Sequence, residues 1–136
     1  MIRDIVHDPM LLSKKSSEAG IGDLGIVQDL QDTLKAYSGR CVGMAANMIG
    51  FSKRIIIVDQ GFGTLVMLNP VIVEKSDPYE TEEGCLSVSG IHKASRYKKI
   101  RVQWQNTAFK TQTGVFSGFT AQIIQHELDH LDGILV

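Results

Sequence analysis

The stretch TAQIIQHELDHLDG, residues 120–133, carries the strongest structural signal in this chain. Its apolar residues recur at helical spacing, Thr120 is of a type favoured at helix N-termini, and Gly133 is of a type favoured just beyond helix C-termini. The stretch therefore predicts one amphipathic helix. His126 and His130 are four positions apart, so they lie on one face of that helix, one turn apart.

The same helix contains the pattern HExxH, formed by His126, Glu127 and His130. Two imidazoles one turn apart can bind one divalent metal ion, while the adjacent glutamate reaches a metal-bound water. The alternative is a solvated helix face with two chance histidines, but chance rarely produces this combination at this spacing. Only six residues follow His130, and Asp132 is the sole potential ligand among them, so a third ligand is expected upstream.

Cys85 is the upstream residue that best fits a third ligand. It lies in the stretch EGCLS, residues 83–87, where glycine and serine predict an irregular, exposed backbone that can present a thiolate. The alternative for Cys85 is an inert buried thiol. Cys41 lacks such surroundings and is interpreted as a small core residue. Two histidines and one cysteine would leave a fourth metal position open for water.

Composition limits the classes of partner. The 136 residues, 43% of them hydrophobic and 21% charged, predict a single domain spanning residues 1–136. A formal net charge of −1 leaves no basic excess for direct nucleic-acid binding. The longest apolar runs are far shorter than the roughly 20 residues that cross a membrane. We therefore expect a cytoplasmic protein without membrane contact.

The remaining sequence predicts one more helix and several short strands. Residues 25–37 have apolar side chains at helical spacing, followed by Gly39. Gly61 and Gly63 predict a hairpin between the first two strands, and hence antiparallel pairing. The predicted strands cover residues 54–59, 65–69, 71–74 and 100–105.

Taken together, these motifs resemble the peptide deformylase family, whose signatures run in the order GxGxAAxQ, EGCxS and QHExxH. The second is intact at residues 83–87 and the third at residues 125–130. The first is altered: Gly43 is kept, but Cys41 stands where the family has glycine and Met48 where it has glutamine. The resemblance implies an α+β fold in which antiparallel strands pack around a central C-terminal helix that carries HExxH.

The resemblance also implies a function. The chain would remove the formyl group from N-formyl-methionyl nascent peptides and release formate. Cys85, His126 and His130 would bind one divalent metal ion, with Fe(II) as the native ion and Zn(II), Co(II) or Ni(II) as replacements. Glu127 would take a proton from the attacking water and pass it to the departing amine. The ribosome is a further candidate partner.

Other site residues follow from the matching motif positions. Gly43 and the backbone N–H of Leu86 would belong to the catalytic site, the latter as a hydrogen-bond donor to the oxyanion. Met48 cannot donate a hydrogen bond, which predicts reduced activity, and the amide of Asn47 is a possible substitute. The expected charged pair beside Cys85 is Glu83 with Arg96. The methionine pocket is expected to be formed by Val42, Met48, Ile91 and Ile123.

Two alternatives to a working deformylase stay open. One is a deformylase-like protein that binds peptide N-termini without turnover, which the altered first motif favours. The other is a hydrolase of a different small N-acyl substrate, with Met48 reshaping the site. An endopeptidase is not expected, because little sequence is left to build an extended cleft.

Overall fold

The computed structural model describes residues 1–136. It contains three α-helices, two short 3₁₀ helices and five strands. The helices are α1 (Pro9–Leu12), η1 (Ile21–Asp23), α2 (Leu24–Ala36), η2 (Ala46–Ile49) and α3 (Gly118–Leu131). The strands are β1 (Gly43–Ala45), β2 (Ile55–Asp59), β3 (Thr64–Gly84), β4 (Ile91–Gln105) and β5 (Thr111–Ser117).

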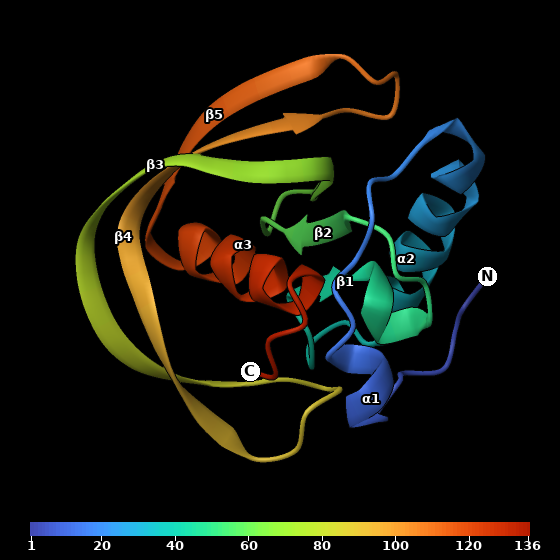
Figure 1. Cartoon of the computed structure of the whole chain (residues 1–136), viewed down its shortest axis with the longest axis horizontal. Helices are drawn as coiled ribbons and strands as arrows, with labels where there is room; N and C mark the ends of the chain where they lie inside the picture. Colours follow the sequence, from blue (N-terminus) through green and yellow to red (C-terminus); the bar gives the residue numbers. More distant parts are fainter.

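The strands form one antiparallel sheet in the order β1-β2-β3-β4-β5, so each strand pairs with the next along the chain. The long β3–β4 hairpin curves around α3, which lies at the centre of the molecule (Figure 1). The predicted α+β arrangement of antiparallel strands around a central HExxH helix is confirmed.

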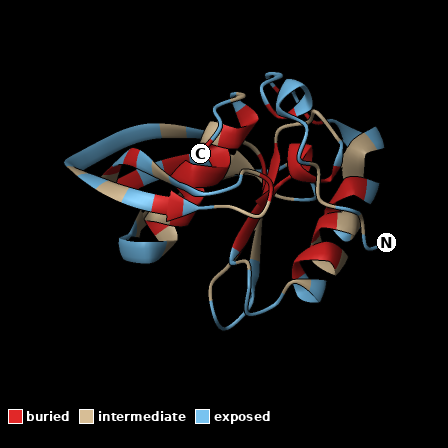
Figure 2. Ribbon diagram, turned by 90° about the horizontal axis from the view of Figure 1, so that it is seen from below, coloured by how far each residue is buried: buried red, intermediate tan, exposed pale blue.

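The central helix is buried because strands and helices surround it. Both α2 and α3 pack against β2, whose residues Ile55, Ile56, Ile57 and Val58 are fully buried. A run of buried residues without alternation is expected where a strand is covered on both faces. Most of α3 is buried in the same way, whereas the bend midway along the β3–β4 hairpin, which includes residues 73–78, is exposed (Figure 2). The HExxH side chains therefore lie in the interior.

Several predicted elements are confirmed. The helix predicted over residues 25–37 is α2, and the strand over residues 54–59 is β2. The predicted hairpin joins β2 to β3, with Asp59 opposite Thr64. Gly133 ends α3 with a φ of 78°, a backbone conformation that glycine adopts readily.

Other boundaries were predicted wrongly. The two strands predicted over residues 65–69 and 71–74 are one strand, β3, which has a register shift between Leu68 and Val71. Pro70 lies in this shift, and such an irregularity accommodates a residue that has no N–H for the ladder. Residues 100–105 form only the second half of β4. No helix in the structure has the length and apolar character needed to span a membrane.

Candidate metal centre and active site

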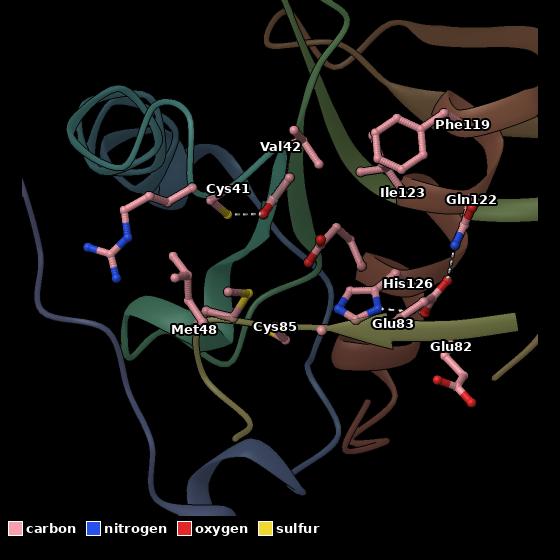
Figure 3. Close-up of a pocket in the computed structure, with 15 residues that line it drawn as sticks. Cys41, Val42, Met48, Glu82, Glu83, Cys85, Phe119, Gln122, Ile123 and His126 are labelled. Atoms are coloured by element: carbon pink, nitrogen blue, oxygen red, sulfur yellow. Dashed lines mark hydrogen bonds and ion pairs between the residues drawn. The ribbon is translucent and has the colours of Figure 1, made fainter. Parts of the chain in front are cut away.

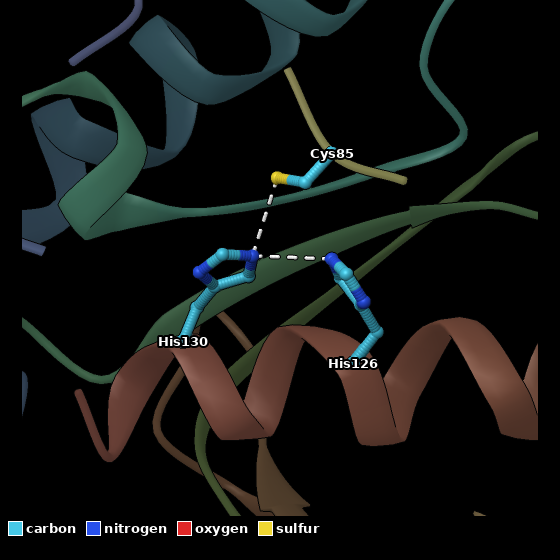
Figure 4. A group of neighbouring side chains, drawn as sticks. All are labelled: Cys85, His126 and His130. Carbon is cyan, nitrogen blue, oxygen red and sulfur yellow. Dashed lines mark hydrogen bonds between the residues drawn. The ribbon is translucent and has the colours of Figure 1, made fainter. Parts of the chain in front are cut away.

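Three potential ligand atoms converge inside the protein. His126 and His130 come from successive turns of α3, and Cys85 is the first residue after β3 (Figure 4). The Nε2 atoms of the two histidines are 3.1 Å apart, and Cys85 Sγ is 3.3 Å from His130 Nε2. All three ligand atoms lie within 4.8 Å of one another.

The chemistry of this donor set fits a divalent transition metal. Thiolate and imidazole ligands suit Zn(II) and Fe(II), and three protein ligands leave a fourth position for water or substrate. His130 is fully buried, and its Nδ1 has no hydrogen-bond partner. Its Nε2 instead faces the other two ligand atoms, which is the orientation that metal binding through Nε2 requires.

A buried charge network supports His126 from behind. Glu83 Oε1 lies 2.8 Å from His126 Nδ1, and the carboxylate also accepts hydrogen bonds from Arg96 Nε and Nη2 at 3.0 and 2.7 Å. Gln122 Nε2 donates to Glu83 Oε2 at 2.9 Å (Figure 3), as a dashed line there shows. Arg96 Nη1 reaches Asp129 Oδ2 at 2.7 Å. The predicted Glu83–Arg96 pair is confirmed. A carboxylate on the outer nitrogen fixes the tautomer and orientation of a metal-binding histidine.

The network separates the pKa values of the two imidazoles. Burial opposes ionisation of Glu83, but hydrogen bonds from His126, Arg96 and Gln122 outweigh it and lower the pKa of the carboxyl to about 2. Burial also lowers the pKa of His126, yet the hydrogen bonds to Cys85 and Glu83 raise it to about 10. In contrast, burial and then the charge on His126 lower the pKa of His130 to about 3. Positive charge in the metal-free site therefore gathers on His126, beside Glu83.

Glu127 lies beside this centre, and neither of its carboxylate oxygens accepts a hydrogen bond from the protein. The residue is only 3% exposed, and Oε1 has no hydrogen-bond partner. Burial raises the pKa of Glu127 to about 7, in the range suited to proton transfer at neutral pH. A Cβ added to Gly43 would lie 3.0 Å from Glu127 Oε2 and 2.5 Å from Ile123 Cγ2. Glycine is therefore needed at position 43 for β1 to approach Glu127 this closely.

A cavity of about 440 Å³ opens over Glu127, and its size suits a small ligand or a peptide end. Cys85 and His126 line it, together with apolar residues such as Val42 and Ile123 (Figure 3). One part of the cavity lining is therefore apolar, and another part consists of candidate metal ligands.

Comparison with known proteins places the chain in a family. The family model described as polypeptide deformylase matches residues 2–136. The chain belongs to this family. A peptide deformylase of Clostridium beijerinckii is 50% identical over 136 residues, which is 100% of both chains. A peptide deformylase of Carboxydothermus hydrogenoformans is 39% identical over 133 residues, 96% of this chain and 86% of that protein.

Solved structures of peptide deformylases have the same fold. The Legionella pneumophila structure has a TM-score of 0.89 and 33% identity, covering 99% of this chain and 83% of that chain. An Acinetobacter baumannii deformylase bound to Met-Ala-Ser has a TM-score of 0.89 and 30% identity, covering 99% and 97% respectively.

Most residues that the deformylase resemblance placed in the catalytic site or the substrate pocket line the cavity. Val42, Gly43, Met48, Leu86 and Ile123 all contribute to it. The position of Leu86 also suits its expected role, because its backbone N–H donates to no protein group.

Ile91 was wrongly predicted to line the pocket. It is the first residue of β4, pairs with Gly84 and is 72% exposed, and it is not part of the cavity wall. The turn after Cys85 is followed directly by β4, which leads the chain away from the cavity.

Cys41, interpreted as a core residue, does pack against the core, and it also lines the cavity of this deformylase. It is half-buried, and its thiol donates a hydrogen bond to the Gly43 carbonyl at 2.8 Å. Burial and then the negative charge of Glu127 raise the pKa of the Cys41 thiol to about 12, which keeps it protonated. Its place in the altered first motif was the one sequence signal of this role. Phe119, which also lines the cavity, gave no such signal.

The Gly43 peptide groups lie on a free sheet edge, since β1 is the terminal strand. Asp59 N–H donates to the Val42 carbonyl at 2.8 Å, and Gly43 is opposite Val58. Hydrogen-bonded and non-hydrogen-bonded pairs alternate along an antiparallel ladder. The N–H and C=O of Gly43 therefore point away from β2. The C=O already accepts the Cys41 thiol, but a carbonyl has two lone pairs, so another backbone segment can still pair with both groups.

Proposed function

We propose that this chain is a working metal-dependent deformylase that removes the formyl group from N-formyl-methionyl peptides and releases formate. The observation that carries the proposal is the free Glu127 oxygen, buried beside a cavity whose wall includes Cys85 and His126. The Clostridium beijerinckii relative that is named peptide deformylase matches the full length of the chain, which supports the same activity here.

Cys85, His126 and His130 would hold the metal ion, with Fe(II) as the native ion and Zn(II), Co(II) or Ni(II) as replacements. When bound, the ion would supply Lewis acidity, which polarises a carbonyl and lowers the pKa of water. Glu83 and Arg96 hold His126 in the orientation that this binding needs.

Glu127 moves the proton in the proposed reaction. Its carboxylate takes a proton from the water that adds to the formyl carbon. The same carboxyl then gives that proton to the nitrogen as the C–N bond breaks, which yields formate and a free amine. The backbone N–H of Leu86, which donates to no other protein group, would donate to the formyl oxygen as negative charge develops there.

The free edge of β1 supports a peptide substrate. The outward N–H and C=O of Gly43 can pair with an extended peptide backbone, which then enters the cavity from the edge of the sheet. Val42, Met48 and Ile123 would surround the methionine side chain. The Acinetobacter baumannii structure with bound Met-Ala-Ser supports this peptide chemistry. The cytoplasmic location and any contact with the ribosome stay predictions.

Met48 supports one competing proposal, a protein that binds peptide N-termini without turnover. Its sulfur accepts the Ala45 N–H at 3.4 Å and offers no donor to an oxyanion. Loss of one such donor typically costs a factor of about 10²–10³ in rate, far less than total enzymatic acceleration. A slower enzyme therefore fits the site better than an inactive one.

Formate release from an N-formyl-methionyl peptide tests the proposal. Protein purified without air and loaded with Co(II) or Ni(II) should release formate well above the Glu127→Ala variant at equal metal content. No release from folded, metal-loaded protein would favour the binding protein. Release of acetate from the N-acetyl peptide, without formate from the formyl peptide, would show the different N-acyl hydrolase.

A further inference from the structure

Asn47 connects η2 to the end of the metal-binding helix. The residue is 3% exposed, and its Nδ2 donates to the backbone carbonyl of His130 at 2.7 Å. This contact joins positions 83 residues apart in the sequence. The expectation that the Asn47 amide would serve the cavity as a donor is wrong, because the amide nitrogen is bonded to α3 and the residue does not line the cavity.

The two metal-binding histidines differ in how their outer nitrogens are satisfied. Both Nε2 atoms face the metal position, so each Nδ1 must carry the proton when metal is bound and needs an acceptor. His126 has Glu83 as that acceptor at 2.8 Å. His130 Nδ1 is buried and has no partner.

An unused acceptor belongs to Asn47. A carbonyl oxygen only accepts hydrogen bonds, so the amide nitrogen of Asn47 must face His130 O, which leaves Oδ1 as an acceptor. Asn47 Oδ1 is also buried without a partner. The unsatisfied donor and the unsatisfied acceptor thus belong to two residues that are already joined by a hydrogen bond.

We propose that Asn47 is a positioning residue for His130, the neutral counterpart of Glu83 for His126. Its Nδ2 holds the His130 backbone, and its Oδ1 accepts the Nδ1 proton through one buried water. The inference rests on the proposed function in one respect, that the site binds a metal. It goes beyond that function because it states which residue orients His130. That residue lies in η2, the 3₁₀ helix that also contains Met48.

The test measures metal retention rather than turnover. Zinc-loaded protein is mixed with excess chelator, and the rate of metal loss is followed for wild type, Asn47→Leu and Asn47→Asp. Removing a group that supports a metal-binding histidine typically costs about 10–100-fold in metal affinity, so Asn47→Leu should lose zinc faster by about that factor. Asn47→Asp keeps an acceptor and should retain zinc better than Asn47→Leu.

Thr33→Val is the matched control. Thr33 is fully buried in α2, and its hydroxyl accepts the Arg3 N–H at 2.9 Å, away from the site. This variant also loses one buried hydrogen bond, and its zinc retention should equal that of wild type. A second readout is the Nδ1 proton of His130 in the NMR spectrum of the zinc form, which should exchange faster with solvent in Asn47→Leu.

Two results would overturn the proposal. One is equal zinc retention in wild type and Asn47→Leu. The other is equal loss in Asn47→Leu and Asn47→Asp with an unchanged Nδ1 proton signal. If Asn47→Leu does not fold, Asn47→Asp decides the test. The chemical shift of the His130 Nδ1 proton must then differ from wild type, because a carboxylate replaces the amide oxygen as its acceptor. A wild type that retains zinc but releases no formate would remove the proposed function and leave this test valid.

Discussion

The site has two walls, α3 and the β1–η2 segment opposite it. The roles of the side chains on α3 could be predicted from the sequence much better than those on the β1–η2 segment. On α3, helical spacing alone placed His126 and His130 on one face, and the structure has them there. On the opposite wall, the use of Cys41 and Asn47 depends on partners that spacing does not identify. In a regular helix the direction of each side chain is predictable from its position in the sequence. In short strands and 3₁₀ turns, tertiary contacts decide that direction.

The largest expected effect tests the helix wall. Glu127→Gln keeps the shape of the side chain but removes the proton acceptor, so kcat for formate release should fall by about 10²–10⁴. Metal content, measured by atomic absorption, should stay at the wild-type value. A Gln variant with a near wild-type rate would show that the proton passes through another group.

The second prediction concerns the network behind that wall. Arg96→Ala leaves the buried Glu83 and the partly exposed Asp129 without their cation, which should cost about 3–5 kcal/mol in free energy of unfolding, mainly through Glu83. Arg101→Ala is the control, because its ion pair with Glu74 is exposed and should contribute less than about 1 kcal/mol. Urea titration of both variants measures the difference. Equal losses of stability in the two variants would show that the buried ion pairs of Arg96 contribute no more to the free energy of unfolding than an exposed pair does.

The same network should be visible in the pH dependence of stability. The pKa of Glu83 is about 2 in the folded protein, below its ordinary value of 4.5. Its ionised form thus stabilises the fold above pH 4.5, and this contribution is lost as the pH falls from 4.5 towards 2. Metal-free wild type should lose stability over this window, and Glu83→Gln should lack that component. Parallel curves for the two proteins would contradict the assignment.

The next prediction moves to the opposite wall. In Gly43→Ala the new Cβ would meet Ile123 at 2.5 Å and Glu127 at 3.0 Å. The Ile123 side chain must move, and the Glu127 carboxyl must give by a few tenths of an ångström. A misplacement of about 1 Å can cost about 10²-fold in rate, so we expect a smaller loss than that here. Gly63→Ala is the control, since a Cβ there meets no atom within 4 Å. Steady-state kinetics should show the loss in Gly43→Ala alone.

Met48→Gln should give the smallest effect, and it is a gain. Glutamine has nearly the same length as methionine, so its Oε1 can accept the Ala45 N–H in place of sulfur while its Nε2 faces the cavity. One restored donor should raise kcat by about tenfold, a part of the full worth of an oxyanion donor. An unchanged kcat would mean that a side-chain amide at position 48 does not donate a hydrogen bond to the oxyanion.

The fold was predictable wherever apolar periodicity was strong. Helices α2 and α3, strand β2 and the β2–β3 hairpin all followed from such patterns. Strand β5 and the first half of β4 escaped prediction because their side chains are largely exposed or half-buried, so no alternating apolar pattern marks them. Sequence distance explains the misassignment of Asn47, which contacts a residue 83 positions away. The place of Cys41 in the cavity wall escaped prediction although its partner, Gly43, is only two positions away, because its orientation depends on the backbone of a short irregular segment.

The ligand atoms come from two separate parts of the chain, and that arrangement has a topological consequence. Cys85 follows β3 and both histidines lie on α3, so a shared ion would close a ring of covalent and coordinate bonds that contains β4 and β5. Such a ring restricts the unfolded chain much as a disulfide does. The ion would then act as a removable cross-link, so that a chelator would loosen the far side of the sheet as well as the catalytic centre.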